Sequence, residues 1–517
     1  MRVERLPEYV TTVTVTALGI AFALYCGTLT GSGQTQVVMM MFGLIASTIV
    51  LLTLRGLIWV LIPITWSLTG IVPSLPIPLT LRDVIVLFTG LAFLLLISLK
   101  LVRLKPKYTL LDLFVAANLL YLATAYIRNP VGALFFESQK VGGRPYLNVA
   151  IGFVAYFVLS RAKLGPRLAG ILPWGAVFGS MVEGILGVLA AKLPIAVPYV
   201  MRFYVSDAFT EWVNPNAATN AEVSGSGRKP MLMYFGGPLA SALYARYRAL
   251  TLINPLYFIR CIAFIGACVL VLLSGFRSAV LSIAAGFIIA TYARDGFRAV
   301  ARLAAIGAPI LIIIIALQGV LFELPLPAQR ALSFLPGRWD YVAVAEARGS
   351  TEWRVEMWRT VLSSNRYIEN KILGDGFGFT QVEMQIRNIG NIATPEEMQE
   401  RYMVTGGFHS GPVSSIRYVG VVGLVLFVTL LVLLAKRAWL LMTKTRGTPY
   451  EFLAFFIGIP IVYEPFNFIV VFGAFDSAFP QALLGAGMLK MLENSLPAEP
   501  LAIRETIQNR SPILNPI

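Results

Sequence analysis

His409 is the only histidine in this chain of 517 residues, and it stands where a polar stretch gives way to an apolar one. The polar stretch runs from Glu323 to Phe408, and a long apolar segment begins at Pro412. Imidazole is the side chain best suited to take or give a proton near neutral pH. A single imidazole at such a boundary therefore indicates proton-transfer chemistry. The alternative is an interfacial histidine that only hydrogen-bonds the backbone.

Three arginines are candidates to bind an anion near the same boundary. Arg277 interrupts two apolar runs at a tight turn, Arg354 lies in the polar stretch, and Arg417 lies about two helical turns into the apolar segment that follows. A guanidinium group can bind phosphate oxygens through two parallel hydrogen bonds, and a buried arginine is costly unless it meets an anion or a partner. The alternatives are a side chain that reaches out to water for Arg277, a solvated loop position for Arg354, and an ion pair with Glu464 or Asp476 for Arg417.

The elements that must position these residues are transmembrane helices. Hydrophobic residues make up 57% of the chain and charged residues 13%, with a mean hydropathy of +0.73. This composition is far more apolar than that of a soluble protein. About fourteen apolar stretches are of spanning or near-spanning length. They lie at 10–30, 36–54, 56–72, 83–99, 109–127, 147–160, 168–190, 231–245, 256–273, 278–292, 303–321, 412–435, 450–468 and 470–489. The sequence therefore predicts an all-α polytopic membrane protein with about 12–14 transmembrane helices.

The basic residues of the short connectors predict the orientation of the chain. With the N-terminus inside, alternate connectors carry Arg55, Lys100, Arg103, Lys105, Lys107, Arg161, Lys163, Arg167, Arg246, Arg248, Arg294, Arg298, Arg302, Lys436, Arg437, Lys444 and Arg446. Cytoplasmic loops are rich in Lys and Arg, so this alternation places both termini in the cytoplasm and residues 323–408 outside it. Much of the net charge of +15 is thus a topology signal, and we expect no nucleic-acid partner.

The predicted organisation has four parts. Residues 1–322 form about eleven transmembrane helices, 323–408 an external loop that folds as a small helical cap, 409–490 about three more helices, and 491–517 a cytoplasmic tail. The loop contains 11 of the 27 acidic residues of the chain, which indicates that it faces water.

Within the loop, two short patterns predict local structure. Ser350-Thr-Glu352 resembles a helix start and predicts a helix over about 351–364. The glycine-rich sequence 373–379 predicts a turn whose backbone N–H groups can approach an anion, although such turns are common. The three cysteines lie in apolar runs, spaced neither for zinc nor for a disulfide framework, and we expect no cofactor.

The residues after His409 favour a helix that points its N-terminus at the outer face. Ser410 or Gly411 suits the N-cap and Pro412 suits the first turn. A helix N-terminus is an anion site, and its positive field favours the neutral imidazole that can accept a proton from a hydroxyl group. We therefore expect His409 to act as a general base or to orient an acceptor hydroxyl.

Together these motifs resemble the O-antigen ligase and O-antigen polymerase-like family. The resemblance covers roughly residues 260–440. It is carried by Ser-Gly-Phe-Arg277-Ser, by Glu352-Trp-Arg354-Val-Glu-Met-Trp358, by Ile372-Leu-Gly-Asp-Gly-Phe-Gly-Phe379, and by Phe408-His409-Ser with Arg417-Tyr-Val-Gly-Val-Val-Gly-Leu. Ligases of this kind commonly have asparagine after the histidine, where this chain has Ser410. This difference bears on the identity of the acceptor more than on that of the donor.

The resemblance implies a fold of the GT-C type and a metal-independent, inverting transfer. A glycan would move from undecaprenyl pyrophosphate to a hydroxyl of a saccharide acceptor, either lipid A core or a growing polysaccharide, on the periplasmic side of the bacterial inner membrane. His409 matches the loop histidine of the family, and Arg277 and Arg354 match its arginines. We assign Arg417 to the same pyrophosphate site. A transporter or flippase of lipid-linked saccharides and a scaffold membrane protein remain as alternatives.

Overall fold

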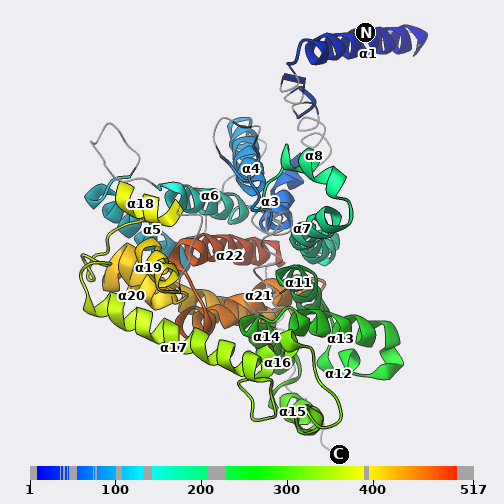
Figure 1. Cartoon of the computed structure of the whole chain (residues 1–517). Coiled ribbons are helices and arrows are strands. Elements are labelled where there is room, and N and C mark those ends of the chain that lie inside the picture. The colour runs from blue at the N-terminus through cyan, green and yellow to red at the C-terminus, as the bar shows by residue number, and fades with distance from the viewer. Residues whose placement is uncertain are drawn as a thin grey trace, which may run out of the picture.

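The computed structural model describes residues 8–34, 37–38, 41–43, 45, 55–73, 75, 78–100, 108–131, 142–206, 229–388 and 395–497. Within these ranges the chain is helical, with three isolated bridges and no strand, as predicted (Figure 1). The first half contains α1 Glu8–Gly31, η1 Arg55–Val60, α3 Leu61–Thr65, α4 Leu81–Ser98, α5 Leu110–Arg128, α6 Arg144–Leu159, α7 Pro166–Lys192, η3 Pro194–Ala196, α8 Val197–Met201 and α11 Pro230–Arg246. The second half contains α12 Ala249–Leu252, η4 Pro255–Tyr257, α13 Phe258–Leu273, α14 Arg277–Asp295, α15 Phe297–Leu317, α16 Leu326–Leu332, α17 Tyr341–Ser363, α18 Gln381–Asn388, α19 Pro395–Thr405, α20 Gly411–Lys444, α21 Glu451–Phe466, η5 Asn467–Val471 and α22 Phe475–Ser495.

Most predicted spans coincide with a helix, and seven described helices are long and apolar enough to cross a membrane. The chain is therefore a multi-pass membrane protein. The predicted stretch 36–54 lies mostly outside the described residues, as does the tail beyond 497. The predicted span 56–72 is wrong, because α3 ends at Thr65 and the chain then turns. Gly70 lies against the ring of Tyr204, which leaves no room for a side chain at that position.

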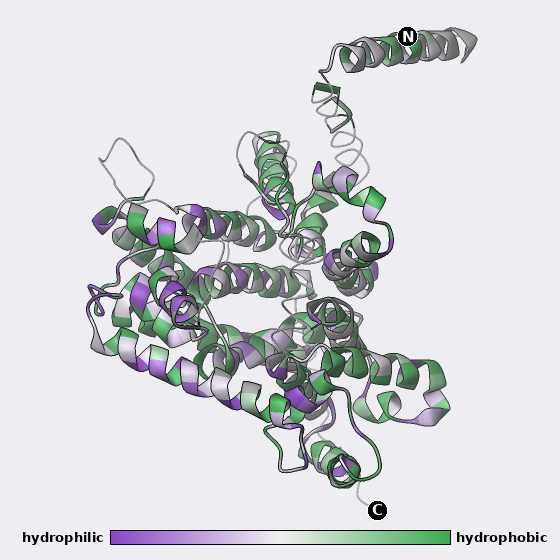
Figure 2. Cartoon of the chain, viewed as in Figure 1, coloured by the Kyte–Doolittle hydropathy of each residue, from purple (hydrophilic) through white to green (hydrophobic). Residues whose placement is uncertain are grey.

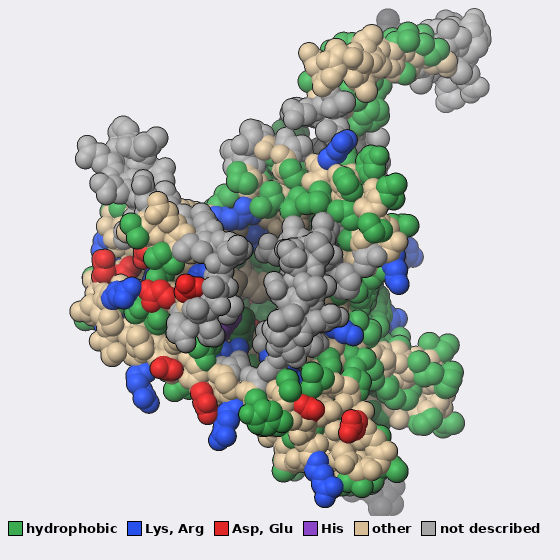
Figure 3. All heavy atoms as spheres, in the orientation of Figure 1, with side chains coloured by type: hydrophobic (Ala, Val, Ile, Leu, Met, Phe, Trp, Pro, Cys, Tyr) green, Lys and Arg blue, Asp and Glu red, His purple; other side chains and the backbone are tan. Residues whose placement is uncertain are grey.

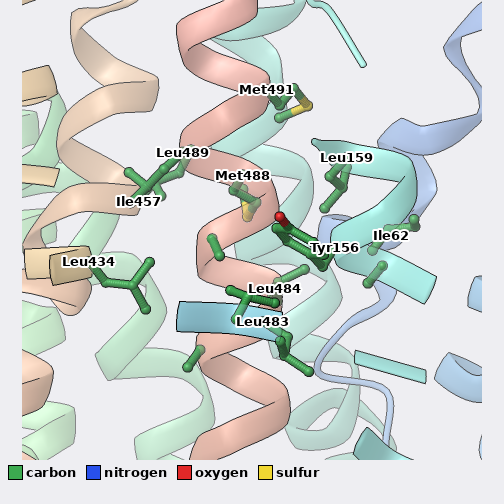
Figure 4. Packing of buried hydrophobic residues seen from close by; sticks show 14 of the residues in the cluster. Ile62, Tyr156, Leu159, Leu434, Ile457, Leu483, Leu484, Met488, Leu489 and Met491 are labelled. Carbon is green, nitrogen blue, oxygen red and sulfur yellow. The ribbon is translucent and has the colours of Figure 1, made fainter. Parts of the chain in front are cut away.

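The core of the bundle forms around α22, which lies between α6 and α21 (Figure 1). Leu483 and Leu489 of α22 are fully buried, and they pack in one cluster with Leu159 of α6 and Ile457 of α21 (Figure 4). Small residues permit the close approach, since a Cβ on Gly487 would lie 3.0 Å from the backbone of Tyr156. Small residues at helix contacts are the usual means of packing in membranes.

Two ion pairs join helices inside the bundle. Lys490 of α22 is bonded to Asp112 of α5, and Arg294 of α14 donates to Glu451 of α21 at 2.8 Å. A lone charge among apolar helices is expensive, so such pairs fix the register of neighbouring helices. Both pairs lie on the side that the sequence assigns to the cytoplasm, away from His409.

The described residues of the polar stretch form four helices, α16 to α19, and its hydrophilic residues contrast with the apolar bundle (Figure 2). Charged side chains gather on the face formed by α17, α18 and α19 (Figure 3). These helices enclose a small core of their own, with Met357, Val361, Ile368 and Phe408 almost fully buried. We call residues 326–408 the cap.

The cap helix predicted at 351–364 begins ten residues earlier, at Tyr341. Its N-cap is Asp340, whose side chain accepts from the amide of Val342 at 2.7 Å. Thr351 lies inside the helix, where its hydroxyl donates to the carbonyl of Ala347. Alanine, glutamate and arginine in 341–350 favour a helix. Ser350 and Thr351 are typical of a helix start, so they suggested a new helix where the existing one continues.

Helix α20 is broken at Gly420, where φ is +68° and ψ is −178°. A break in a helix leaves backbone amides and carbonyls without their usual partners. Here the cap supplies them: the amides of Val421 and Val422 donate to the carbonyls of Lys371 and Ile372 at 2.9 and 3.3 Å. The 24 residues after the break span about 36 Å, which is enough to cross a bilayer of about 30 Å. The segment Gly411–Val419 is therefore not needed for crossing.

Candidate functional site

His409 occupies a backbone conformation that few residues adopt. Its φ is +51°, in the left-handed region, and α20 begins two residues later, at Gly411. Ser410 is the N-cap, as the sequence predicted, with its side chain accepting from the amide of Val413 at 3.5 Å. A left-handed conformation costs a residue with a side chain about 1 kcal/mol or more. The surrounding contacts therefore hold His409 in place against a local strain.

Those contacts come from three aromatic rings on three different elements. The imidazole centroid lies 5.1 Å from Tyr402 of α19, 5.3 Å from Phe472 after η5, and 6.2 Å from Trp353 of α17. Next to it, the indole of Trp358 donates to the carbonyl of Phe408 at 2.7 Å. The imidazole is half-buried, so it is both fixed and accessible. This is the arrangement expected of a preorganised proton acceptor.

Arg277 and Arg354 both lie along α17. Arg277 is the first residue of α14, and its guanidinium donates to the carbonyl of Ala347 at 3.2 Å. Arg354 follows Trp353, which contacts the imidazole. Ala347 and Trp353 are separated by about 9 Å along the helix axis. Both arginines are half-buried, so two cations lie against or on α17, and Arg354 adjoins the tryptophan that contacts His409.

Arg417 is bound by the cap. It is 4% exposed, and it donates to the carbonyl of Tyr367 at 2.7 Å and to Glu383 of α18 at 3.3 Å. The sequence pointed to Glu464 or Asp476 as its possible ion-pair partner, whereas the partner is an acid of the cap. The guanidinium also lies over the ring of Phe379. Arg417 thus fastens the cap to the first segment of α20.

The hydroxyl of Tyr367 belongs to the same network. It donates to Glu400 of α19 at 2.8 Å, and Glu400 also pairs with Arg366. Burial, together with the hydrogen bond to Glu400, raises the pKa of Tyr367. The phenol therefore stays protonated at neutral pH and keeps donating to the carboxylate.

The glycine-rich turn at 373–379 does not present its amides to an anion. The amides of Asp375 and Gly376 donate to the carbonyls of Arg417 and Tyr418 at 2.7 and 3.0 Å. Gly374, with φ of +80°, lies so close to Gly420 that a Cβ would approach its nitrogen to 2.5 Å. The glycines therefore serve the close contact with the broken helix, and the predicted anion-binding role is wrong for these amides.

A cavity of about 520 Å³ lies near the imidazole, although His409 is not one of the residues that line it. Tyr402, which contacts His409, and Gly407 form part of its wall. The other residues lining the cavity are Gly142, Arg144, Pro145, Asn148, Phe379, Arg401, Thr405, Tyr418 and Asp476. Its volume lies within the range of about 300–1,000 Å³ that is typical of small-molecule sites. The cavity joins the cap to connectors near α6 and α22.

Arg144, Arg401 and Asp476 were not among the predicted site residues, although the sequence carries a signal for the first. Arg144, like Arg82 and Arg128, stands on a connector that the predicted topology places outside, where Lys and Arg are normally scarce. An arginine in a connector where basic residues are scarce is expected to bind a specific partner. Arg401 and Asp476 carry no comparable signal, because charged residues are ordinary in a water-facing loop and at a helix start.

Residues 262–428 match the family model of O-antigen ligase. The matched segment runs from α13 through the break in α20, and it contains His409, Arg277, Arg354 and Arg417. No curated protein matches the chain.

Proposed function

We propose, from the match of residues 262–428 to the family model of O-antigen ligase, that this chain is a membrane glycosyltransferase. Its substrates are a glycan carried on undecaprenyl pyrophosphate and a saccharide acceptor, either lipid A core or a growing polysaccharide. The acceptor hydroxyl attacks the anomeric carbon of the donor at the periplasmic face of the bacterial inner membrane. The transfer is inverting and independent of metal ions.

The observation that carries the proposal is the setting of His409. The imidazole is held in a strained backbone conformation, between three aromatic rings, and next to a cavity of about 520 Å³. Strain of this kind concentrates at functional sites. In our mechanism, the imidazole accepts the proton of the acceptor hydroxyl as the new glycosidic bond forms and the bond to the lipid pyrophosphate breaks.

Arg277 and Arg354 are the proposed ligands of the pyrophosphate. Both guanidinium groups lie along α17, and Arg354 adjoins the tryptophan that contacts the imidazole. Negative charge grows on the pyrophosphate as it leaves, and fixed guanidinium groups stabilise that charge without rearranging. Arg417 was assigned to the same site from the sequence. Its contacts with Tyr367 and Glu383 favour a positioning role over phosphate binding.

The periplasmic assignment is supported by the connectors that meet at the cavity. Residues 142–148, the cap and the start of α22 all belong to the side that the alternation of basic loops places outside. Segments far apart in the sequence thus line one cavity, and the positive-inside rule assigns all of them to the periplasmic side. The predicted cytoplasmic position of both termini follows from the same alternation.

The test is the substitution His409→Asn in the full-length protein. Asparagine tolerates the left-handed conformation, so the backbone should be preserved while the proton acceptor is lost. We expect transfer from an undecaprenyl-pyrophosphate-linked glycan to fall by about 10²- to 10⁴-fold. His409→Gly is the matched variant, since it relieves the strain and should also be inactive. Thermal stability in detergent should match or exceed that of the wild type for both.

Retention of activity in well-folded His409→Asn protein would remove the general-base role. A transporter of lipid-linked saccharides would behave in this way, because moving a lipid across the bilayer requires no proton acceptor at the outer end of α20. Movement of a fluorescent lipid-linked saccharide across proteoliposomes, unaffected by the substitution, would identify that activity.

A further inference from the structure

The cavity beside His409 has two walls of different origin. One wall lies within the family-matched segment and consists of Phe379, Arg401, Tyr402, Thr405, Gly407 and Tyr418. The other wall lies outside that segment and consists of Gly142, Arg144, Pro145, Asn148 and Asp476. The reacting groups named above lie in the matched segment. The second wall is therefore contributed by parts of the chain outside the matched segment.

The charges lining the cavity are predominantly positive. The guanidinium of Arg401 makes no ion pair with any residue that the structure describes. Arg144 lies 3.9 Å from the carboxylate of Asp83, which is fully buried and already receives Arg82 at 3.1 Å. Arg82 thus neutralises Asp83, and Arg144 remains in excess. Among the described residues that line the cavity, one acid, Asp476, stands against these two cations, so this lining carries a net positive charge.

The remaining groups suit a saccharide. Asn148 supplies an amide, and the carboxylate of Asp476 can accept hydrogen bonds from sugar hydroxyls. The rings of Tyr402 and Tyr418 supply apolar faces of the kind on which sugar rings pack. Tyr402 contacts both the cavity and the imidazole, so a hydroxyl of a bound saccharide lies close to the proposed proton acceptor.

We propose that this cavity is the acceptor subsite and that it selects a saccharide bearing an anionic group, either phosphate or carboxylate. The inference rests on the proposed function, since it divides the proposed glycosyltransferase site into a donor side and an acceptor side. Arg277 and Arg354 along α17 hold the donor pyrophosphate, and Arg144 with Arg401 holds the anion of the acceptor.

Direct binding tests the inference without catalysis. Purified wild-type protein is titrated calorimetrically with tetragalacturonate and with its methyl ester, which has the same sugars without the charge. A second pair, phosphorylated pentamannose and its dephosphorylated form, tests phosphate in place of carboxylate. We expect at least one anionic saccharide to bind about tenfold tighter than its neutral counterpart. No discrimination in either pair would overturn the proposal.

Two variants locate the effect. Arg401→Gln should abolish most of the discrimination, whereas Arg359→Gln, an exposed arginine on α17, should keep it. Equal loss in both variants would mean that the discrimination comes from general surface charge. His409→Asn should bind the anionic saccharide as the wild type does, so a failure of the catalytic proposal is read separately from a failure of this one.

Competition assigns the subsite to acceptor or donor. In a transfer assay with core lipopolysaccharide as acceptor, the anionic saccharide should inhibit competitively against the acceptor and raise its KM. Inhibition competitive against the lipid-linked donor would place the donor glycan in the cavity and overturn the acceptor assignment.

Discussion

Replacing Arg417 by methionine separates two roles that the sequence alone did not distinguish. Methionine keeps the length and apolar stem of the side chain and removes the guanidinium. If Arg417 fastens the cap to α20, the substitution should loosen the cap in the absence of any substrate. If Arg417 binds pyrophosphate, the cap should stay closed and the donor should bind less well.

The size of the effect follows from the contacts that are lost. Arg417 is 4% exposed, and its hydrogen bond to the carbonyl of Tyr367, 2.7 Å long, joins a charged donor to a buried acceptor. Such a bond contributes about 1.5–3 kcal/mol. Glu383 is 29% exposed, so the ion pair adds about 1 kcal/mol at most. The opening free energy of the cap should therefore fall by about 1.5–4 kcal/mol, which corresponds to a roughly 10- to 700-fold larger equilibrium constant for opening.

Hydrogen–deuterium exchange measures this opening directly. Peptides covering 364–376 and 401–419 should exchange faster by that factor, while peptides of α22 should be unchanged. Arg366→Met is the matched control, because Arg366 is 69% exposed and its pair with Glu400 is worth about 1 kcal/mol or less. Unchanged exchange in Arg417→Met together with a raised KM for the lipid-linked donor would refute the positioning role and restore the phosphate-binding one.

Three further predictions concern the break in α20, the donor site and metal ions. Gly420→Ala should destabilise the protein by at least about 2 kcal/mol, because a Cβ would lie 2.1 Å from the carbonyl oxygen of Ile372 at a position with positive φ. The control is Gly266→Ala, where a Cβ would meet no atom within 4 Å, and it should not change the melting temperature. Equal melting temperatures for the two variants would contradict the account of the break. Arg277→Lys should lower kcat/KM for the lipid-linked donor by about tenfold, since an ammonium group cannot reproduce a forked contact; wild-type kinetics would exclude Arg277 as a donor ligand. Dialysis against EDTA should leave the transfer rate unchanged, and recovery of a lost rate on adding Mg²⁺ would refute metal independence.

The membrane helices were largely predictable, because the requirement that drives them is visible locally. A spanning helix must be apolar over its whole length, and the stretches predicted at 83–99, 109–127 and 168–190 agree with α4, α5 and α7 to within two residues at each end. The stretch at 56–72 satisfied the same criterion and failed. The helix ends at Thr65, and Gly70 then packs against the ring of Tyr204, more than a hundred residues away, a contact that hydropathy does not register.

The candidate site was predictable only where single residues carried a signal. His409 stands out by being alone, and the N-cap at Ser410 follows from local chemistry. The partner of Arg417 did not follow, because the choice between Glu383, Glu464 and Asp476 is made by how the cap folds over α20. The role of the glycines at 374 and 376 was misjudged for the same reason: glycine indicates close approach, and the sequence does not say to what.

The break at Gly420 has a consequence for exchanging parts between related proteins. Backbone amides of α20 are satisfied by carbonyls of residues 371–372, and carbonyls of α20 by amides of residues 375–376. Cap and helix are thus one hydrogen-bonded unit, although a hydropathy profile would cut the chain between them. A chimaera that replaces 326–408 alone would leave these amides and carbonyls of α20 facing a foreign cap. A workable graft has to carry the segment through Val422 with it.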